Sequence, residues 1–428
     1  MELLPRFKHI FTSYAPEATT RSNVWNNIWD GFWWCVMLGF TQSFIGVFAI
    51  SLGASDYMLG LLVSLPALVA LIAQIPAAII TEKHHSRLKV VIPYGLLYRG
   101  SFLLFAIIPF LPFSPVNRAW IFIILLSVVN FPQTISAVAW SAMMGDIFPE
   151  NLRGRIFSDR NMLLGIATLC CTLIAGPILD IVPSPYNFPV IFILSFCALM
   201  LSTKYLTKII EKPKAIASTE MVKRGGHWGG IRKALHDRNF IFFTLSLFII
   251  HIGFNVPAAL WTIFHVKVLL LSKTFIGIIA VTSQIISVLS FRWWGRFADK
   301  YGNRTALWVS ILIFMPQPFF HIFVVSGMGL VPLAMMNGLA SAGFSMVLFN
   351  TLLEISPDGS IRPSYIAVFN ASMGITGFLA PMIGIAIFQA TSLAVVFSLA
   401  SAIRLLGLVI MIKTVKGTLP SLKPLGFR

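Results

Sequence analysis

Charged residues are scarce in this 428-residue sequence: they make up 11% of it, whereas 57% of the residues are hydrophobic. A soluble domain carries about 25% charged residues. A soluble fold of this length would therefore lack the polar surface needed to cover its exterior. A lipid bilayer accepts apolar side chains on the outside of a protein, so the composition predicts an integral membrane protein.

Several signatures of other protein classes are also missing. No G-x-x-x-x-G-K-[ST] loop is present, which excludes ATP hydrolysis by this chain alone. The four cysteines have no metal-site spacing, so neither a disulfide nor a metal site is predicted. An intramembrane enzyme would need Asp, His or Ser residues clustered in one plane of the membrane, and the sequence indicates no such cluster. We therefore expect no catalytic residues and no cofactor. Residues 1–23 contain no apolar core of a cleavable signal peptide.

Long apolar runs are the main feature that is present. Runs of about 20 apolar residues match the length needed to cross the hydrocarbon core, and they are too long and too uniformly apolar for barrel strands. The sequence therefore predicts an all-α membrane protein. Its twelve expected transmembrane helices cover residues 30–52, 57–80, 88–111, 119–143, 162–183, 188–206, 240–264, 274–294, 305–327, 329–353, 364–389 and 392–412.

The basic residues are unevenly distributed between the connections. Odd-numbered connections carry only Arg118, Lys267 and Lys273, whereas the stretch 207–239 and the even-numbered connections are rich in lysine and arginine. Basic loops stay on the cytoplasmic side, so both termini are expected in the cytoplasm and the protein in the plasma membrane. The net charge of +17 is then a topology signal, and no nucleic-acid partner is predicted. The basic residues of the shorter even-numbered connections are Lys83, Arg87, Lys89, Arg153, Arg155, Arg160, Arg292, Arg296, Lys300 and Arg304.

The stretch 207–239 separates six predicted spans from six others and has no long apolar run. It is interpreted as a cytoplasmic linker, with a short interfacial helix near 230–238. The predicted organisation is a cytoplasmic tail at 1–23, a six-helix bundle at 24–206, the linker at 207–239, a second six-helix bundle at 240–412 and a cytoplasmic tail at 413–428.

The two predicted bundles repeat each other. The second span begins S-D-Y-M-L-G at Ser55 and the eighth begins S-K-T-F-I-G at Ser272, an offset of 217 residues that also takes Glu82-Lys83 to Asp299-Lys300. The fourth span ends in D-I-F-P-E from Asp146 and the tenth in E-I-S-P-D from Glu354, an offset of 208 residues. Landmarks in the same order on the same side predict two parallel halves related by an axis along the membrane normal.

The loop at 295–304, G-R-F-A-D-K-Y-G-N-R, resembles the signature loop of the major facilitator superfamily, G-x-x-x-D-[RK]-x-G-[RK]-[RK]. It departs from that pattern only at Asn303. The first-half copy at 78–87 is degenerate, with Ala78, Glu82 and His85 in place of Gly, Asp and Gly. The resemblance extends over the chain through the repeat. It implies a secondary transporter with a central cavity lined mainly by spans 1, 4, 7 and 10.

In the family this loop is thought to latch the two halves in one conformation. The resemblance therefore implies gating roles for the two loops and for the Asp/Glu-x-x-Pro elements. In one conformation we expect Glu82 to pair with Arg153 or Arg155, and Asp299 with Arg362. A loop that only anchors the topology is the alternative. The predicted latch residues are Glu82, Lys83, Arg153, Arg155, Gly295, Asp299, Lys300, Gly302, Arg304, Glu354 and Arg362.

Polar residues inside the predicted spans are candidates for solute binding, because unpaired polar groups are costly in lipid. In the seventh span, His251 and Asn255 lie on one helical stripe. The alternative is that such residues hydrogen-bond one helix to another, and that tryptophans belong to the interface belts. The candidates for the central cavity are Trp34, Gln42, Asn130, Gln133, His251, Asn255, Asn337 and Ser341.

Two arginines are predicted to lie deep in the membrane. Arg99 is about 11 residues into the third span and Arg404 about 12 into the twelfth. Arg99 has no counterpart in the repeat, which favours an anionic substrate or a buried ion pair; packing against a helix end or a carboxylate is the alternative for both. Asp30 is expected as an interfacial charge at the start of the first span, with a proton relay as the alternative. His251 is the best-placed titratable group for proton coupling.

These features predict a monomeric secondary transporter that moves a small solute by alternating access, coupled to protons. Gly176-Pro177 weakly resembles the antiporter signature of the family and favours efflux. The amide- and aromatic-rich spans favour a neutral or amphipathic solute. The alternative function is a transporter-like membrane sensor or interaction protein that has lost transport.

Overall fold

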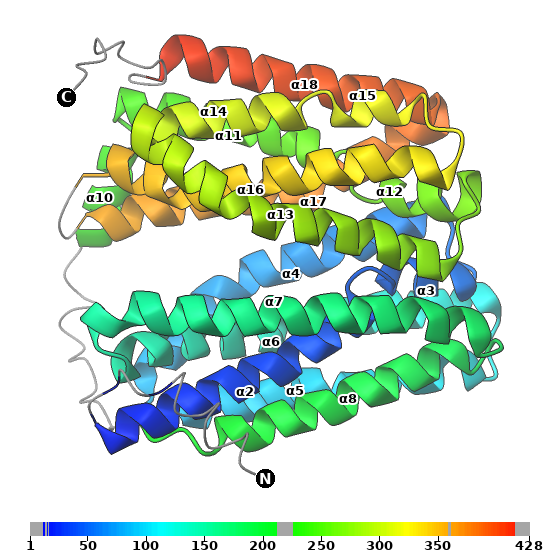
Figure 1. The fold of residues 1–428 in the computed structure, drawn as a ribbon, viewed down its shortest axis with the longest axis horizontal. Helices are drawn as coiled ribbons and strands as arrows, with labels where there is room; N and C mark the ends of the chain where they lie inside the picture. The colour runs from blue at the N-terminus through cyan, green and yellow to red at the C-terminus, as the bar shows by residue number, and fades with distance from the viewer. Residues whose placement is uncertain (1–11, 13–14, 16, 212–225, 358–360, 416–428) are drawn as a thin grey trace. The chain divides into compact units, whose positions relative to one another are not determined.

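The structure, a computed structural model, describes residues 12, 15, 17–211, 226–357 and 361–415. Within these ranges all regular structure is helical and no strand occurs (Figure 1). Parts of the predicted tails and of the predicted linker lie outside the described residues. The chain divides into two compact units, Met1–Ser218 with Ser272–Ile278 and Thr219–Leu271 with Ile279–Arg428, here called unit 1 and unit 2.

Unit 1 contains the helices of the first predicted half. A bent pair opens it, and the first turn of the later helix α13 also belongs to it. Its helices are α2 (Ala18–Thr41), α3 (Ile45–Ser51), α4 (Asp56–Lys83), α5 (Leu88–Ile107), the short 3-10 helix η1 (Ile108–Phe110), α6 (Pro115–Ile147), α7 (Glu150–Ile181) and α8 (Asn187–Leu206).

Unit 2 contains the helices of the second predicted half, preceded by the short helix expected near 230–238. Its elements are α10 (Gly226–Ala234), α11 (Arg238–Asn255), α12 (Leu260–Ile263), the π-helical turn η2 (Phe264–Val268), α13 (Lys273–Tyr301) after its first turn, α14 (Asn303–Phe314), α15 (Gln317–His321), the 3-10 turn η3 (Gly327–Gly329), α16 (Leu330–Ile355), α17 (Arg362–Ala390) and α18 (Leu393–Thr414).

The membrane-spanning segments agree with the predicted all-α architecture. Ten helical segments of the described chain are long and apolar enough to cross a bilayer, and the bent pair α2–α3 makes an eleventh. The one remaining predicted span, the ninth at 305–327, is interrupted in the structure: α14 ends at Phe314 and α15 begins at Gln317. Pro316 and Pro318 explain this break, because proline removes a backbone donor and disfavours continued helix.

Several helices begin at residues that satisfy free backbone N–H groups. The side chains of Ser55, Ser114 and Ser392 accept hydrogen bonds from the backbone three residues further on in α4, α6 and α18. Asp237 accepts from the N–H groups of Asn239 and Phe240 at the start of α11. These caps fix the helix starts that the hydrophobic runs alone leave open.

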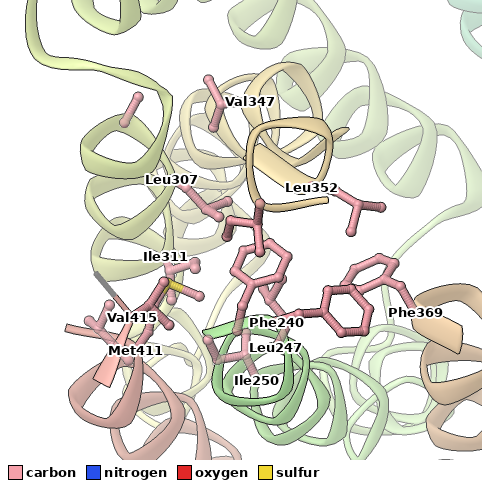
Figure 2. Close-up of a cluster of buried hydrophobic side chains, with 14 of the residues drawn as sticks. Phe240, Leu247, Ile250, Leu307, Ile311, Val347, Leu352, Phe369, Met411 and Val415 are labelled. Atoms are coloured by element: carbon pink, nitrogen blue, oxygen red, sulfur yellow. The ribbon is translucent and has the colours of Figure 1, made fainter. Parts of the chain in front are cut away.

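Each unit has its own apolar core. In unit 1, α2 packs on α7 and α8, and α6 packs on α4 and α5. In unit 2, Phe240, Leu247 and Ile250 of α11 lie at the centre of a buried cluster that draws side chains from α14, α16, α17 and α18 (Figure 2). The labelled partners from those helices and the segment after α18 are Leu307, Ile311, Val347, Leu352, Phe369, Met411 and Val415.

Arg404 shows how unit 2 accommodates a charge in its interior. Its Nε donates to the Gly253 carbonyl at 3.0 Å and its Nη1 to the Phe314 carbonyl at 2.8 Å. The residues four positions after these carbonyls are Pro257 and Pro318, which have no N–H to offer. Arg404 therefore satisfies two carbonyls that prolines leave without a helical donor. This agrees with the alternative given for Arg404 from the sequence, in which it packs against a helix end.

Candidate functional site

A cavity of about 360 Å³ lies inside unit 1. Five helices line it, namely α2, α5, α6, α7 and α8, and every lining residue belongs to unit 1. Its volume lies in the range of small-molecule sites, about 300–1,000 Å³. Its walls combine three charged side chains with aromatic, small polar and aliphatic ones: Asp30, Trp34, Val91, Gly95, Arg99, Gln133, Ser136, Ala137, Trp140, Ser141, Arg160, Leu164 and Leu206.

Asp30 is the only carboxylate among the lining residues. It is 5% exposed and lies in the middle of α2, because that helix begins at Ala18. The expectation of an interfacial charge at the helix start was therefore wrong. The Asp30 carboxylate accepts a hydrogen bond from Ser202 Oγ at 2.6 Å and lies 3.9 Å from Arg99 Nη2. This contact links α2 to α8 and to α5.

Arg99 is held at one wall of the cavity by α8. Its Nη1 donates to Thr203 Oγ1 at 2.6 Å and its Nη2 to Ser202 Oγ at 3.2 Å. The guanidinium also lies 6.0 Å from the ring centre of Trp34. Its Nε is buried without a hydrogen-bond partner among the described residues. The buried ion pair that the sequence offered as one reading of Arg99 is present, and one donor of this arginine is unused.

Arg160 is a lining residue that the sequence placed elsewhere. It was assigned to the fourth cytoplasmic connection, but α7 begins at Glu150, so Arg160 lies within the helix. Its Nε donates to the Asn27 carbonyl at 3.2 Å, and its guanidinium lies 5.0 Å from the ring centre of Trp140. Both Arg160 and Arg99 attract the Asp30 carboxylate electrostatically.

The guanidinium of Arg160 fits against α2 because residue 31 is glycine. A Cβ built on Gly31 would lie 2.5 Å from Arg160 Nη2, closer than van der Waals contact permits. A glycine in α2 opposite a basic residue in α7 is the signal in the sequence that could have identified this site. This signal can be recognised only once α2 and α7 are known to be neighbours, which the sequence alone does not show.

Only some of the cavity residues predicted in the first half line the cavity of unit 1. Trp34 and Gln133 line the cavity of unit 1. Asn130 does not; its Nδ2 donates to the Leu126 carbonyl of its own helix at 2.7 Å. Gln42 is exposed at the end of α2. The structure therefore brings two of the four first-half candidates to one cavity. They lie there beside Asp30, Arg99 and Arg160, which the sequence analysis treated separately from the cavity residues.

The predicted cavity residues of the second half make hydrogen bonds within unit 2. Asn255 Nδ2 donates to Thr376 Oγ1 of α17 at 3.2 Å, and Asn337 Oδ1 accepts from Ser283 Oγ of α13 at 3.0 Å. His251 Nδ1 contacts the Leu247 carbonyl at 2.9 Å, and Ser341 Oγ donates to the Gly338 carbonyl at 3.1 Å. Asn255 and Asn337 therefore join helices, which is the alternative use of membrane amides.

The repeat places one ion pair at the same position in each unit. Arg87 Nε lies 3.7 Å from Asp146 Oδ2 in unit 1, and Arg304 Nε lies 3.7 Å from Glu354 Oε2 in unit 2. The two arginines are related by the 217-residue offset and the two acids by the 208-residue offset. Each pair connects the start of one helix, α5 or α14, to the end of another, α6 or α16. Asn303, the departure from the family pattern, also donates to Glu354 at 2.6 Å.

The carboxylates predicted as latches do not form the ion pairs that were proposed for them in the part of the chain that the structure describes. Glu82 and Asp299 are exposed, and among the described residues no ion pair joins them to Arg153, Arg155 or Arg362. Arg153 donates instead to the carbonyls of Gly145 and Phe148 at the end of α6. The pairing of Glu82 and Asp299 in another conformation stays a prediction.

The remaining loop residues have local roles. Gly302 has φ of +87° and precedes α14, a conformation that favours glycine. A Cβ on Gly295 would lie 3.3 Å from the terminal methyl of Met346, so this glycine packs α13 close to α16. Lys300 Nζ lies 5.0 Å from the ring centre of Tyr301. Lys83 is exposed in the last turn of α4.

The repeated membrane helices and repeated loops define a class, the polytopic membrane transporters built from two parallel bundles. The family model of the Major Facilitator Superfamily matches residues 32–259 and 243–426, essentially one match for each half. The chain belongs to this superfamily. The family and fold are those of transporters rather than enzymes, and the resemblance of the loop at 295–304 is confirmed.

Solved structures of transporters share the fold. The nucleoside transporter NupG is similar with a TM-score of 0.65 and 14% identity, covering 94% of this chain and 100% of that one. A D-xylose-proton symporter is similar with a TM-score of 0.65 and 15% identity, covering 93% and 98%. A POT family transporter in complex with 5-aminolevulinic acid is similar with a TM-score of 0.70 and 12% identity, covering 91% and 95%. No curated protein matches the sequence.

Proposed function

We propose that this protein is a secondary transporter of the plasma membrane that moves a small solute by alternating access, and that the cavity of unit 1 binds this solute. The observation that carries the proposal is the cavity itself, with two arginines and one aspartate on membrane-spanning helices. Ionisable side chains at membrane depth are costly and mark solute or ion pathways by default. Helix packing alone gives no reason to gather three of them around an open space.

Proton coupling is best assigned to Asp30. It is the only carboxylate among the lining residues, and it holds Arg99 and Ser202 while it is ionised. Protonation of Asp30 would weaken its attraction to Arg99 and so link proton uptake to the arrangement of α2, α5 and α8. His251, the candidate from the sequence, is not among the residues that line this cavity.

A two-stage experiment tests the transport function. A thermal-shift screen of purified protein first identifies solutes that raise the melting temperature. These solutes are then added to proteoliposomes that contain a pH-sensitive dye, with radiolabelled uptake measured in parallel. A proton-coupled transporter acidifies or alkalinises the lumen only when solute is present. Solutes that bind without any flux would contradict transport and favour the membrane-sensor alternative.

The coupling role of Asp30 is tested by Asp30→Asn. We expect this variant to lose accumulation driven by a proton gradient but to keep solute exchange between the two sides. Asp159→Asn is the matched control, because Asp159 lies on α7 next to Arg160 without lining the cavity. Accumulation by Asp30→Asn at the level of the control would show that the proton uses another group.

We propose efflux as the direction of net transport. The support is the resemblance of Gly176-Pro177 to the antiporter signature of the family; in the structure Gly176 packs α7 closely against the first turn of α13, since a Cβ there would lie 2.6 Å from Thr274 Cα. Everted membrane vesicles distinguish the directions, because an exporter accumulates solute in them. Accumulation only in right-side-out vesicles would show uptake instead.

A further inference from the structure

We infer that the cavity of unit 1 is a site for a monovalent organic anion, which places a carboxylate-type oxyanion between Arg99 and Arg160 and an apolar body against the remaining walls. This inference names the substrate class of the proposed function and rests on it only in taking the bound anion to be the transported solute. It narrows the neutral or amphipathic solute that the sequence favoured to an amphipathic anion, in line with the anionic substrate that Arg99 suggested.

The charge of the lining residues is the first reason. Arg99 and Arg160 contribute two positive charges and Asp30 one negative charge, so the lining side chains carry one unbalanced positive charge. Arginine remains protonated in proteins, and an uncompensated charge at membrane depth is costly. One bound monoanion makes the cavity neutral. A neutral solute leaves the charge unbalanced, and a cation increases it.

Unused donors are the second reason. The terminal nitrogens of Arg99 are held by Thr203 Oγ1 and Ser202 Oγ, so Arg99 contributes its positive charge, and the free donors belong to Arg160. Arg160 makes one hydrogen bond within the described chain, from Nε to the Asn27 carbonyl, which leaves its two terminal nitrogens for a ligand. A guanidinium presents parallel N–H groups that match a carboxylate, and such charge-assisted bonds are the strong ones.

Arg404 shows what a buried arginine without a ligand role looks like in this protein. Its Nε and Nη1 both bond to carbonyls that prolines leave without a helical donor, and its guanidinium lies 4.6 Å from the ring centre of Phe254. It is not among the residues lining the cavity. The arginines of the cavity differ from it because they face a space and an aspartate, and their donors are only partly used.

The rest of the lining sets the shape of the ligand. The side chains of Val91, Leu164 and Leu206 are apolar, and Trp34 and Trp140 add aromatic surface. A hydrated inorganic ion would gain nothing from these walls, whereas a carboxylate attached to a planar or aliphatic body buries its apolar part there. Gln133, Ser136 and Ser141 provide a few further polar groups. The site therefore fits a small amphipathic carboxylate.

Binding is measured directly on the purified full-length protein in detergent, independently of flux. The probes are 2-naphthoate, its neutral analogue 2-naphthamide, the cation 2-naphthylmethylammonium and the dianion 2,6-naphthalenedicarboxylate, with quenching of tryptophan fluorescence and thermal shift as two readouts. We expect saturable binding of 2-naphthoate, at least tenfold weaker binding of 2-naphthamide and no binding of the cation. Equal binding of the acid and the amide would overturn the inference.

Three variants identify the residues. Arg160→Gln removes the unbalanced charge and should weaken 2-naphthoate binding at least tenfold, with little change for 2-naphthamide. Gly31→Ala keeps every charge but occupies the space of the Arg160 guanidinium, and it should weaken 2-naphthoate similarly. Asp30→Asn raises the cavity charge and should shift the preference towards the dianion. Lys204→Gln, which removes an exposed positive charge from α8 outside the cavity, should leave binding unchanged.

The outcomes separate this inference from the proposed function. Saturable anion binding that is lost in Arg160→Gln but gives no flux in proteoliposomes would support the site and contradict transport. Flux of a neutral or cationic solute without anion binding would support transport and overturn the anion site. Loss of 2-naphthoate binding in Lys204→Gln to the same extent as in Arg160→Gln would show that only the overall charge of the protein attracts the anion.

Discussion

Replacing Arg404 by methionine should destabilise unit 2 through two backbone carbonyls. Methionine is unbranched and apolar; it replaces the aliphatic part of the arginine side chain, lacks the guanidinium group and offers no donor. The carbonyls of Gly253 and Phe314 would lose their bonds to Arg404, and Pro257 and Pro318 prevent the helices from supplying replacements. An unsatisfied buried polar group costs about 1–3 kcal/mol, and neighbouring groups normally satisfy proline-freed carbonyls in membranes.

The expected loss in the free energy of unfolding is about 2–4 kcal/mol for the two carbonyls together, because part of the cost is offset by no longer burying a charge. The contact with the ring of Phe254 adds to the loss, since a desolvated cation–π contact contributes about 2 kcal/mol or more. Thermal unfolding in detergent, followed by size-exclusion chromatography of the remaining folded protein, measures the difference.

The proline explanation can be tested separately by restoring a donor. Pro257→Ala in the Arg404→Met background gives residue 257 an N–H that can reach the Gly253 carbonyl, so we expect it to recover part of the lost melting temperature. Pro257→Ala in the native background should have a much smaller effect. An unchanged melting temperature in Arg404→Met, or no recovery in the double variant, would refute this reasoning.

Three further substitutions test contacts elsewhere by thermal unfolding. Glu211→Ala should cost about 1–2 kcal/mol, because this carboxylate accepts from Ser86 Oγ and from the backbone N–H groups of residues 87 and 88 at the start of α5; no loss would show that water replaces it. Gly384→Ala should destabilise unit 2 strongly, since a Cβ there would clash with the Val256 carbonyl, which is backbone and cannot rotate away; a tolerated alanine would show that α17 shifts freely. Asp180→Ala should cost about 1 kcal/mol, because Asp180 Oδ2 accepts from the N–H and Oγ1 of Thr274 at the start of α13; an unchanged melting temperature would contradict this capping role.

The helices were predictable because their signal is local. A run of about 20 apolar residues has one stable arrangement in a bilayer, in which all backbone groups are paired within the helix. The bounds were less predictable where helices extend beyond the lipid. The sequence placed the first span from residue 30 and the fifth from 162, whereas α2 begins at Ala18 and α7 at Glu150, because polar residues continue both helices.

Those two bounds explain the errors in the candidate site. Asp30 looked interfacial and Arg160 looked like a loop residue because the polar segments before them were read as connections. Both side chains are instead helical, and both are brought to one cavity by the packing of α2 against α7. Such packing between distant segments is not encoded in any local pattern. Arg99 and Asp30 were each recognisable as unusual, but their pairing was not.

The use of Arg404 could have been predicted more fully. A proline four residues after another residue removes the helical donor for that residue's carbonyl, and the sequence contains this relation for Gly253 with Pro257 and for Phe314 with Pro318. What the sequence does not show is that one side chain from α18 reaches both carbonyls. That coincidence follows from the three-dimensional packing of α11, α14 and α18.

The unequal use of buried arginines in the two units has a consequence for how the protein can change over generations. The repeat keeps the loop ion pairs alike in both halves, but one half holds its arginines beside a cavity and the other uses its arginine to complete the backbone of its own helices. Substitutions at Arg160 or Gly31 would alter selectivity while leaving the fold intact, whereas a substitution at Arg404 has no such freedom. With the proposed site in unit 1, new solute preferences should therefore arise through substitutions in the first half of the gene.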